Sequence, residues 1–261
     1  MVQAAAKTFD VLFAFKSRYG LMTVAEVTAQ CGLSRNQVYR CLKTLEALGI
    51  VREETRGFRL TTKLLELVPA MGEPALLAVA EPLLLELRDA TRETVNLVAP
   101  VDDDQTICLA TYPPSRSIGL LTRPGQRSRL HAGAVPKAML AFMDSAVIDR
   151  VLAALPDLPR YTERTELDPR RLLEELRKIR ERGFSVSNGD FEEGARGVGV
   201  PIFGPDGRPL GGFSIGGPAA RVDDASLARY ARLALSTSAA ISQRLGYRPD
   251  GIHGVEPSAS H

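Results

Sequence analysis

A short basic segment carries the clearest chemistry in this 261-residue sequence. From Ser34 onward, apolar residues recur at helical spacing, and Arg, Lys, Asn, Gln and Tyr occupy the positions between them. Arg and Lys bond guanine edges or phosphates, Asn and Gln form paired bonds with adenine, and Tyr reaches phosphate or sugar. We therefore expect contacts with a double-stranded DNA operator from Thr23, Ser34, Arg35, Asn36, Gln37, Tyr39, Arg40, Lys43 and Arg56.

The elements around this segment decide how its basic side chains are interpreted. Residues 23–26 and 34–37 have capping-box patterns, so Thr23 and Ser34 are expected to be helix caps first and phosphate contacts second. Helices are predicted at 4–18 and at 61–72, and residues 50–60 have the pattern of two short strands around a glycine turn. By itself the basic helix could be only a solvated surface, but a helix, helix, tight turn, helix and hairpin in this order favour a winged helix-turn-helix.

Charge is distributed unevenly along the chain. Residues 1–72 contain ten Lys or Arg against six Asp or Glu, whereas the remainder contains 23 against 25. A basic excess confined to one part is expected where one domain meets phosphate and another does not. We predict a DNA-binding domain at 1–72, a linker helix at 73–92, an effector-binding and oligomerisation domain at 93–246, and a flexible tail at 247–261.

The second domain is predicted to be of the α+β class with an antiparallel sheet and flanking helices. Pro74 and Pro82 are expected at or near the start of the helix that precedes it. Strands grouped at both ends of the domain, with helices between and after them, do not maintain the alternation of a parallel doubly wound sheet. The expected strands are 94–101, 106–112, 117–122, 184–188, 197–203 and 209–215, and the expected helices are 136–142, 146–155, 169–182 and 224–245.

Several function classes have no support in the sequence. There is no run of about 20 apolar residues and no signal-peptide order at the start, so a cytoplasmic location is expected. Cys31, Cys41 and Cys108 are irregularly spaced, and His131 is the single histidine inside the expected fold, so neither a metal nor a cofactor is expected. Because hydrolase and nucleotide-binding motifs are absent, we expect no enzyme and no catalytic residue.

Both domains resemble one family. The resemblance rests on the run from Gly32 to Leu42, on Leu130-His131-Ala132, on 137–141, and on the block from Gly183 to Gly207. In order and spacing these are similar to the IclR family of bacterial transcription regulators, from about residue 8 to residue 246. The resemblance implies a GAF-like effector-binding domain, a homodimer or dimer of dimers, and control of nearby genes of small-molecule metabolism.

The resemblance also implies where an effector would bind. It would lie between the sheet and the helix that follows the His-Ala motif, in contact with Leu130, Ala134, Val135, Ser187, Ala195, Gly197, Ser214 and Gly216. A helix N-terminus suits a carboxylate, and Pro136 is expected at the first helical position. The family usually has glycine where this chain has Pro136, and members that bind small oxoacids have an acid and a cysteine at the positions of Ser187 and Gly197.

These departures predict a roomier pocket and favour an aromatic or otherwise larger acid. The glycines of this region could instead serve only close packing. His131 is a structural histidine or a ligand contact, and Lys137 senses an anion or forms a salt bridge; the sequence does not choose.

One alternative from another class remains open at this level. The protein could be an architectural DNA-binding protein whose second domain only oligomerises. The apolar residues at 83–87 and 227–245 are available either for subunit contacts or for the core. The identity of the effector, the operator sequence and the sign of regulation are not encoded in any motif.

Overall fold

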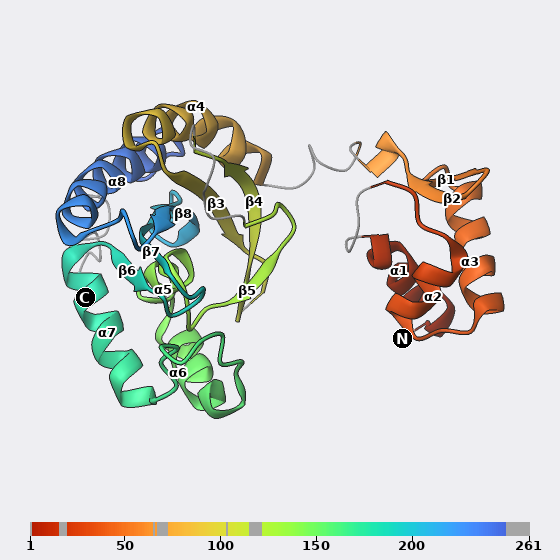
Figure 1. The fold of residues 1–261 in the computed structure, drawn as a ribbon, viewed down its shortest axis with the longest axis horizontal. Coiled ribbons are helices and arrows are strands. Elements are labelled where there is room, and N and C mark those ends of the chain that lie inside the picture. Colours follow the sequence, from red (N-terminus) through yellow and green to blue (C-terminus); the bar gives the residue numbers. More distant parts are fainter. Residues whose placement is uncertain are drawn as a thin grey trace, which may run out of the picture. The chain divides into compact units, whose positions relative to one another are not determined.

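The computed structural model describes residues 2–15, 20–64, 66, 73–102, 104–114 and 122–248. Contacts divide the chain into two compact units, Met1–Pro74 and Ala75–His261 (Figure 1). The strand expected at 117–122 falls on residues outside the described ranges except for Thr122, and so does most of the helix expected at 61–72. The expected tail is described only as far as residue 248.

The first unit has the predicted order of elements. It consists of α1 (Gln3–Ala14), α2 (Val24–Cys31), α3 (Arg35–Ala47), β1 (Val51–Glu54) and β2 (Gly57–Leu60). The hydroxyl of Thr23 accepts from the Glu26 N–H at 3.2 Å, and that of Ser34 accepts from the Gln37 N–H at 3.4 Å. Both predicted capping boxes are confirmed, because the Glu26 and Gln37 side chains also accept from the backbone of the capping residues.

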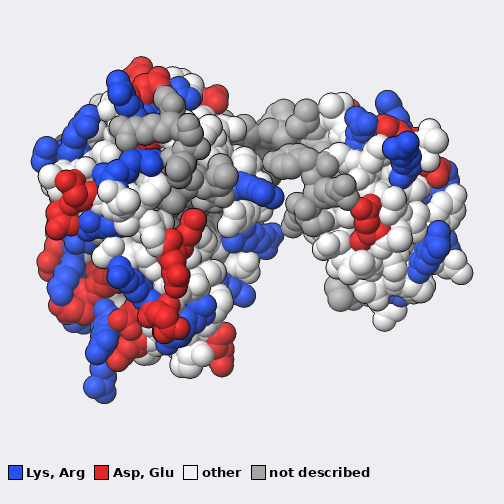
Figure 2. Space-filling view, viewed as in Figure 1, with Lys and Arg blue, Asp and Glu red and all other residues white. Residues whose placement is uncertain are grey.

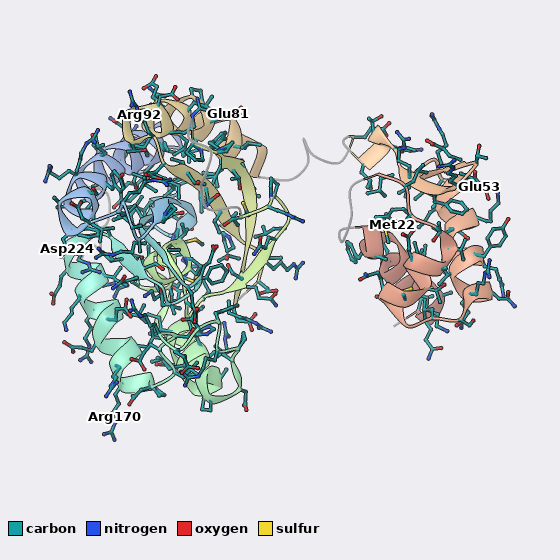
Figure 3. The ribbon with its side chains drawn as sticks, in the orientation of Figure 1. Met22, Glu53, Glu81, Arg92, Arg170 and Asp224 are labelled. Carbon is teal, nitrogen blue, oxygen red and sulfur yellow. The ribbon has the colours of Figure 1, made fainter. Side chains whose placement is uncertain are left out.

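A buried methionine joins the hairpin to the helices of this unit. Met22 exchanges two backbone hydrogen bonds with Phe58, of 2.9 and 2.8 Å, and both side chains belong to the core of α1, α2 and α3. Figure 3 labels Met22 inside the unit and Glu53 at its surface. A Cβ at position 57 would lie 2.4 Å from the Met22 carbonyl oxygen, so this contact requires Gly57.

The second unit is built on a six-stranded antiparallel sheet with the order β5-β4-β3-β8-β7-β6. The predicted α+β class is confirmed. Its elements are α4 (Glu73–Thr91), β3 (Thr94–Pro100), β4 (Gln105–Tyr112), β5 (Arg127–Arg129), α5 (Ala134–Leu140), α6 (Ser145–Ala154), η3 (Leu155–Asp157), α7 (Pro169–Arg182), β6 (Ser185–Asn188), β7 (Ala195–Phe203), β8 (Pro209–Pro218) and α8 (Asp224–Arg244).

Three local predictions differ from this structure. Strand β5 was not expected, because three residues are too few to show a periodicity. Helix α5 begins at Ala134, so Pro136 is its third residue and not its first. Pro82 lies inside the continuous helix α4 and does not start a new helix.

The two faces of the sheet meet different helices (Figure 1). Successive strand residues point to opposite faces. Residues such as Leu97 and Phe213 pack with α4 and α8, whereas Val98 on the opposite face packs with Val135 and Met139 of α5. The apolar residues of α4 and α8 are largely core residues of this unit, including Leu84, Leu87, Leu227 and Ile241. The segment expected as a linker helix is therefore also part of this core.

Candidate functional site

One side of α3 is exposed and rich in hydrogen-bonding groups. Arg35, Asn36, Tyr39, Arg40 and Lys43 are all exposed. At about 100° per residue these five positions span an arc of about 140°. The opposite side carries the buried residues Val38, Leu42 and Leu45, which fix the helix to the core. The predicted separation of an apolar stripe from a polar face is therefore present.

Two side chains of this polar face already have partners within the unit. Lys43 Nζ donates to Glu46 and to Glu53 Oε2, the latter at 3.1 Å. The hydrogen bond to Glu46, followed by that to Glu53, raises the pKa of Lys43 above its ordinary value. The Tyr39 ring meets the edge of Phe58, with centroids 6.5 Å apart and an interplanar angle of 76°. Lys43 and Tyr39 thus connect α3 to the hairpin.

The remaining predicted DNA contacts lie at the helix starts and in the hairpin turn. Thr23, Ser34 and Gln37 form the capping boxes, so their side-chain oxygens bond within the protein. Arg56 is exposed between β1 and β2, and Arg59 pairs with Glu54 at 3.0 Å. Figure 2 shows Lys and Arg surfaces over α3 and the hairpin with acidic groups among them. Four of the predicted DNA contacts are therefore exposed and take no part in these contacts within the unit: Arg35, Asn36, Arg40 and Arg56.

A second candidate site lies where α5 approaches the sheet. Strand register places Thr111, Asn96, Ser214, Gly199 and Ser185 in one row across the sheet face that meets α5. A Cβ at position 199 would lie 2.3 Å from the carbonyl carbon of Ala134, so only glycine lets α5 begin directly on β7. Ser185 Oγ donates to the Ala134 carbonyl oxygen and fixes this end of the helix.

Beside this contact lies a partly open cavity of about 80 Å³. Of the predicted effector contacts, Ala134, Val135 and Ser214 line it. The other lining residues are Asn96, Val98, Cys108, Thr122, Gln126, Ser128, Ala132, Gly133, Pro136 and Phe191. The volume is about half of the roughly 150 Å³ cavity that holds benzene in another protein, so this space is small where the sequence predicted a roomy pocket.

The other predicted effector contacts lie outside this cavity lining. Gly216, Gly197 and Ser187 form the next row of the same sheet face, and Ser187 donates to Asp190. Ala195 pairs with Pro218, farther along β7. Leu130 is fully buried in the cluster that joins α5, α6 and α7. The structure thus brings together only part of the set that the resemblance implied.

Asn96 is the lining residue that sequence reasoning missed most clearly. It is 7% exposed and stands inside β3, whose sequence Thr-Val-Asn-Leu-Val-Ala-Pro is otherwise largely apolar. A polar amide inside such a strand is the signal that could have identified it, because buried polar groups cost free energy unless they are bonded. Gln126, Ser128 and Phe191 carried no comparable signal.

Lys137 forms a buried salt bridge. Its Nζ lies 2.7 Å from Asp190 and 2.6 Å from Glu175. Burial alone would lower the pKa of Lys137, but the two carboxylates outweigh it and the pKa is raised. Asp190 also accepts from the Gly133 N–H at 3.1 Å. Of the two roles considered for Lys137, the structure supports the salt bridge.

His131 has the environment of a structural histidine. Its Nε2 bonds the Pro159 carbonyl oxygen at 3.1 Å, and its ring stacks on Tyr161 with centroids 5.6 Å apart. Burial lowers the pKa of His131, while the bond to Pro159 opposes that shift. The ring centroids of Tyr161 and Phe191 are 4.7 Å apart, and Phe191 lines the cavity. Contacts between aromatic rings therefore connect His131 to the cavity wall.

The described residues contain neither a metal-binding cluster nor a membrane-spanning helix. No group of three or more His, Cys, Asp or Glu side chains there could hold a metal ion. No helix in those ranges is long and apolar enough to cross a membrane.

A helix-turn-helix with a hairpin, followed by an α+β unit with a cavity, defines a two-domain DNA-binding regulator. Two family models match the chain: the IclR helix-turn-helix domain at residues 4–55 and the bacterial transcriptional regulator IclR C-terminal domain at 70–243. The chain belongs to the IclR family of bacterial transcription regulators.

Relatives and solved structures agree with this assignment. The transcriptional regulator KdgR of Escherichia coli is 30% identical over 249 residues, which cover 94% of each chain. The Thermotoga maritima IclR structure has a TM-score of 0.73 at 27% identity and covers 95% of this chain and 100% of its own. An IclR homologue of Microbacterium hydrocarbonoxydans, solved with 4-hydroxybenzoate, has a TM-score of 0.82 at 22% identity, covers 93% and 98%, and shares the fold.

Proposed function

We propose that this regulator reads its operator through Arg35, Asn36 and Arg40 of α3, with Arg56 of the hairpin on phosphate. The observation that carries the proposal is the exposed polar arc of α3 opposite its buried stripe. The early turns of the second helix of such a motif enter the major groove, and basic hairpin residues lie against the DNA backbone. We assign Lys43 and Gln37 a secondary role in DNA binding because their side chains already form hydrogen bonds within the protein.

We further propose that the cavity beside α5 holds a small organic acid and that the regulator controls nearby metabolic genes. Pro136 has no N–H and the Gly133 N–H bonds Asp190, so the start of α5 offers the N–H groups of Ala134 and Val135 to a carboxylate. The Microbacterium homologue was solved with 4-hydroxybenzoate, and this aromatic acid is a suitable probe of the size of the cavity.

Self-association completes the proposal. A dimer would place two copies of α3 on half-sites about one helical turn of DNA apart, which is how helix-turn-helix proteins use operator symmetry. Because α4 and α8 bury much of their apolar surface inside one chain, the subunit contact is expected to use other surfaces. Light scattering of the purified protein, with and without operator, measures the assembly.

The testing experiment is a fluorescence-anisotropy titration against the upstream DNA of the gene and a scrambled duplex at one salt concentration. Salt is fixed because phosphate contacts make affinity depend steeply on it. A preference for the upstream DNA of about a thousandfold or more, altered by a carboxylate metabolite, is the expected result. Equal weak binding to both duplexes, with no response to any acid, would favour an architectural role.

A further inference from the structure

Asn96 has a buried acceptor atom without a partner. Its Nδ2 donates to Thr122 Oγ1 at 3.4 Å, whereas its Oδ1 is buried and has no hydrogen-bond partner. Among the described residues, Tyr112, His131 and Arg196 also have such an atom, but Asn96 is the one that lines the cavity. A buried acceptor that stays unbonded destabilises the folded protein, so a natural partner for Oδ1 is expected.

Two hydroxyl groups near Asn96 already have hydrogen-bond partners elsewhere. The Thr111 hydroxyl, adjacent to Asn96 across the β3–β4 pair, donates to the Thr122 carbonyl oxygen. Ser128 bonds Thr106 at 2.8 Å on the side of the outer strands. On the other side Asn96 faces Ser214 of β8, whose side chain also borders the cavity. The cavity itself is therefore the direction from which Oδ1 can receive a proton donor.

The residues that line the cavity limit the kind of molecule that could carry this hydrogen-bond donor. The described residues that line the cavity carry hydroxyl, thiol and amide groups together with apolar groups, and none of them is charged. With about 80 Å³ the cavity suits a molecule smaller than a benzene ring. A carboxylate has no proton to donate to an amide oxygen, so an acid that satisfies Asn96 needs a further group with a donor.

We propose that the effector is a small hydroxy acid and that Asn96 determines specificity by accepting a hydrogen bond from its hydroxyl at Oδ1. This proposal rests on the effector role assigned to the cavity above. It makes the hydroxyl the recognised feature, because an analogue without it leaves Oδ1 buried and unbonded in a filled cavity. Such analogues are rejected more strongly by polar sites than differences of one methylene are by apolar sites.

Matched compounds test the proposal on the full-length protein. Isothermal titration with lactate, as each enantiomer, and with propionate compares two acids of equal charge that differ by one hydroxyl. Methyl lactate and methyl propionate repeat the comparison without the carboxylate. We expect at least one lactate enantiomer to bind about tenfold or more tightly than propionate. If solvent satisfies Oδ1, lactate and propionate should bind with equal affinity.

Two variants connect the effect to Asn96. Asn96→Leu keeps a similar size and removes the acceptor, so the ratio between lactate and propionate should fall to about one. Asn188→Leu changes the exposed last residue of β6, outside the cavity lining, so it is the matched control and should keep the wild-type ratio. The wild-type comparison alone decides the proposal if Asn96→Leu does not fold.

The outcomes separate this proposal from the proposed function. Propionate that binds as tightly as lactate overturns the role of Asn96 and leaves an acid-sensing regulator. Binding of methyl lactate alone supports Asn96 and removes the acid from the proposed function. If none of the four compounds binds, the role of Asn96 is overturned, while the DNA titration still judges the regulator by itself.

Discussion

Nζ of Lys43 on α3 lies 3.1 Å from Oε2 of Glu53 on β1. A cation on the helix expected to read DNA is thus neutralised by an acid on the neighbouring hairpin. The pKa of Glu46, the second partner of Lys43, is lowered because Lys43 donates to it. The polar face of α3 therefore contains groups that we propose to contact DNA and groups that hold the first unit together.

Removing this acid should strengthen DNA binding. In Glu53→Gln the Lys43 ammonium loses an anionic partner and the surface loses a negative charge, so we expect affinity to rise a few-fold for both upstream and scrambled duplexes. Fluorescence anisotropy at two salt concentrations measures the change. An unchanged salt dependence and affinity would place Glu53 away from the DNA.

Arg40 should contribute to operator binding with little effect on folding. Its side chain is exposed and opposite the buried stripe of α3, so Arg40→Ala should weaken operator binding by about tenfold, in the range for a lost arginine contact. The matched control is Arg177→Ala, exposed on α7 of the other unit. If the Arg40 variant binds the operator with wild-type affinity and its thermal unfolding is unchanged, Arg40 does not contact the operator.

Lys137 should matter strongly for stability. Lys137→Met leaves Asp190 and Glu175 without their shared cation, and breaking a buried pair from one side costs about 3–5 kcal/mol. Urea unfolding measures the free energy. Lys178→Met, which removes an exposed lysine paired with Glu174, should change it by less than about 1 kcal/mol. Equal losses in the two variants would contradict the structural role of Lys137.

His131 should make the protein less stable in mild acid. Burial holds the pKa of folded His131 below its ordinary value, and Arg129 and Lys137 act in the same direction while Asp190 opposes them. The unfolded chain takes up a proton near pH 6.5 and the folded chain only at lower pH, so stability falls as pH falls below about 6.5. Urea midpoints at about pH 7.5 and 5.5 should differ more for the wild type than for His131→Gln.

Phe191 should limit the size of the effector. Its side chain lines the cavity and lies against Gly133, where a Cβ would be 3.5 Å away. Phe191→Ala should enlarge the cavity and let 4-hydroxybenzoate raise the melting temperature more than it does in the wild type. The control is Phe184→Ala, which removes a ring packed against the core between the sheet and helices α4 and α8. An equal response in all three proteins would show that Phe191 does not close the site.

The sequence by itself determined the features that depend on neighbours a few residues apart. Capping boxes at Thr23 and Ser34 join residues three positions apart, so their patterns were readable, and the buried stripe of α3 followed from helical periodicity. The grouping of strands was sufficient to predict an antiparallel α+β domain, because strand spacing and turns are also local signals.

Only the tertiary structure decided which side chains meet across long separations. Asn96 and Ser214 share a row because of the register between β3 and β8, and a register is set by pairing over the whole sheet. Lys43 met Glu53, and Lys137 met Asp190, through the packing of separate elements. Helix α5 begins directly on β7 because Gly199 admits the Ala134 backbone, a contact that no spacing along the chain encodes.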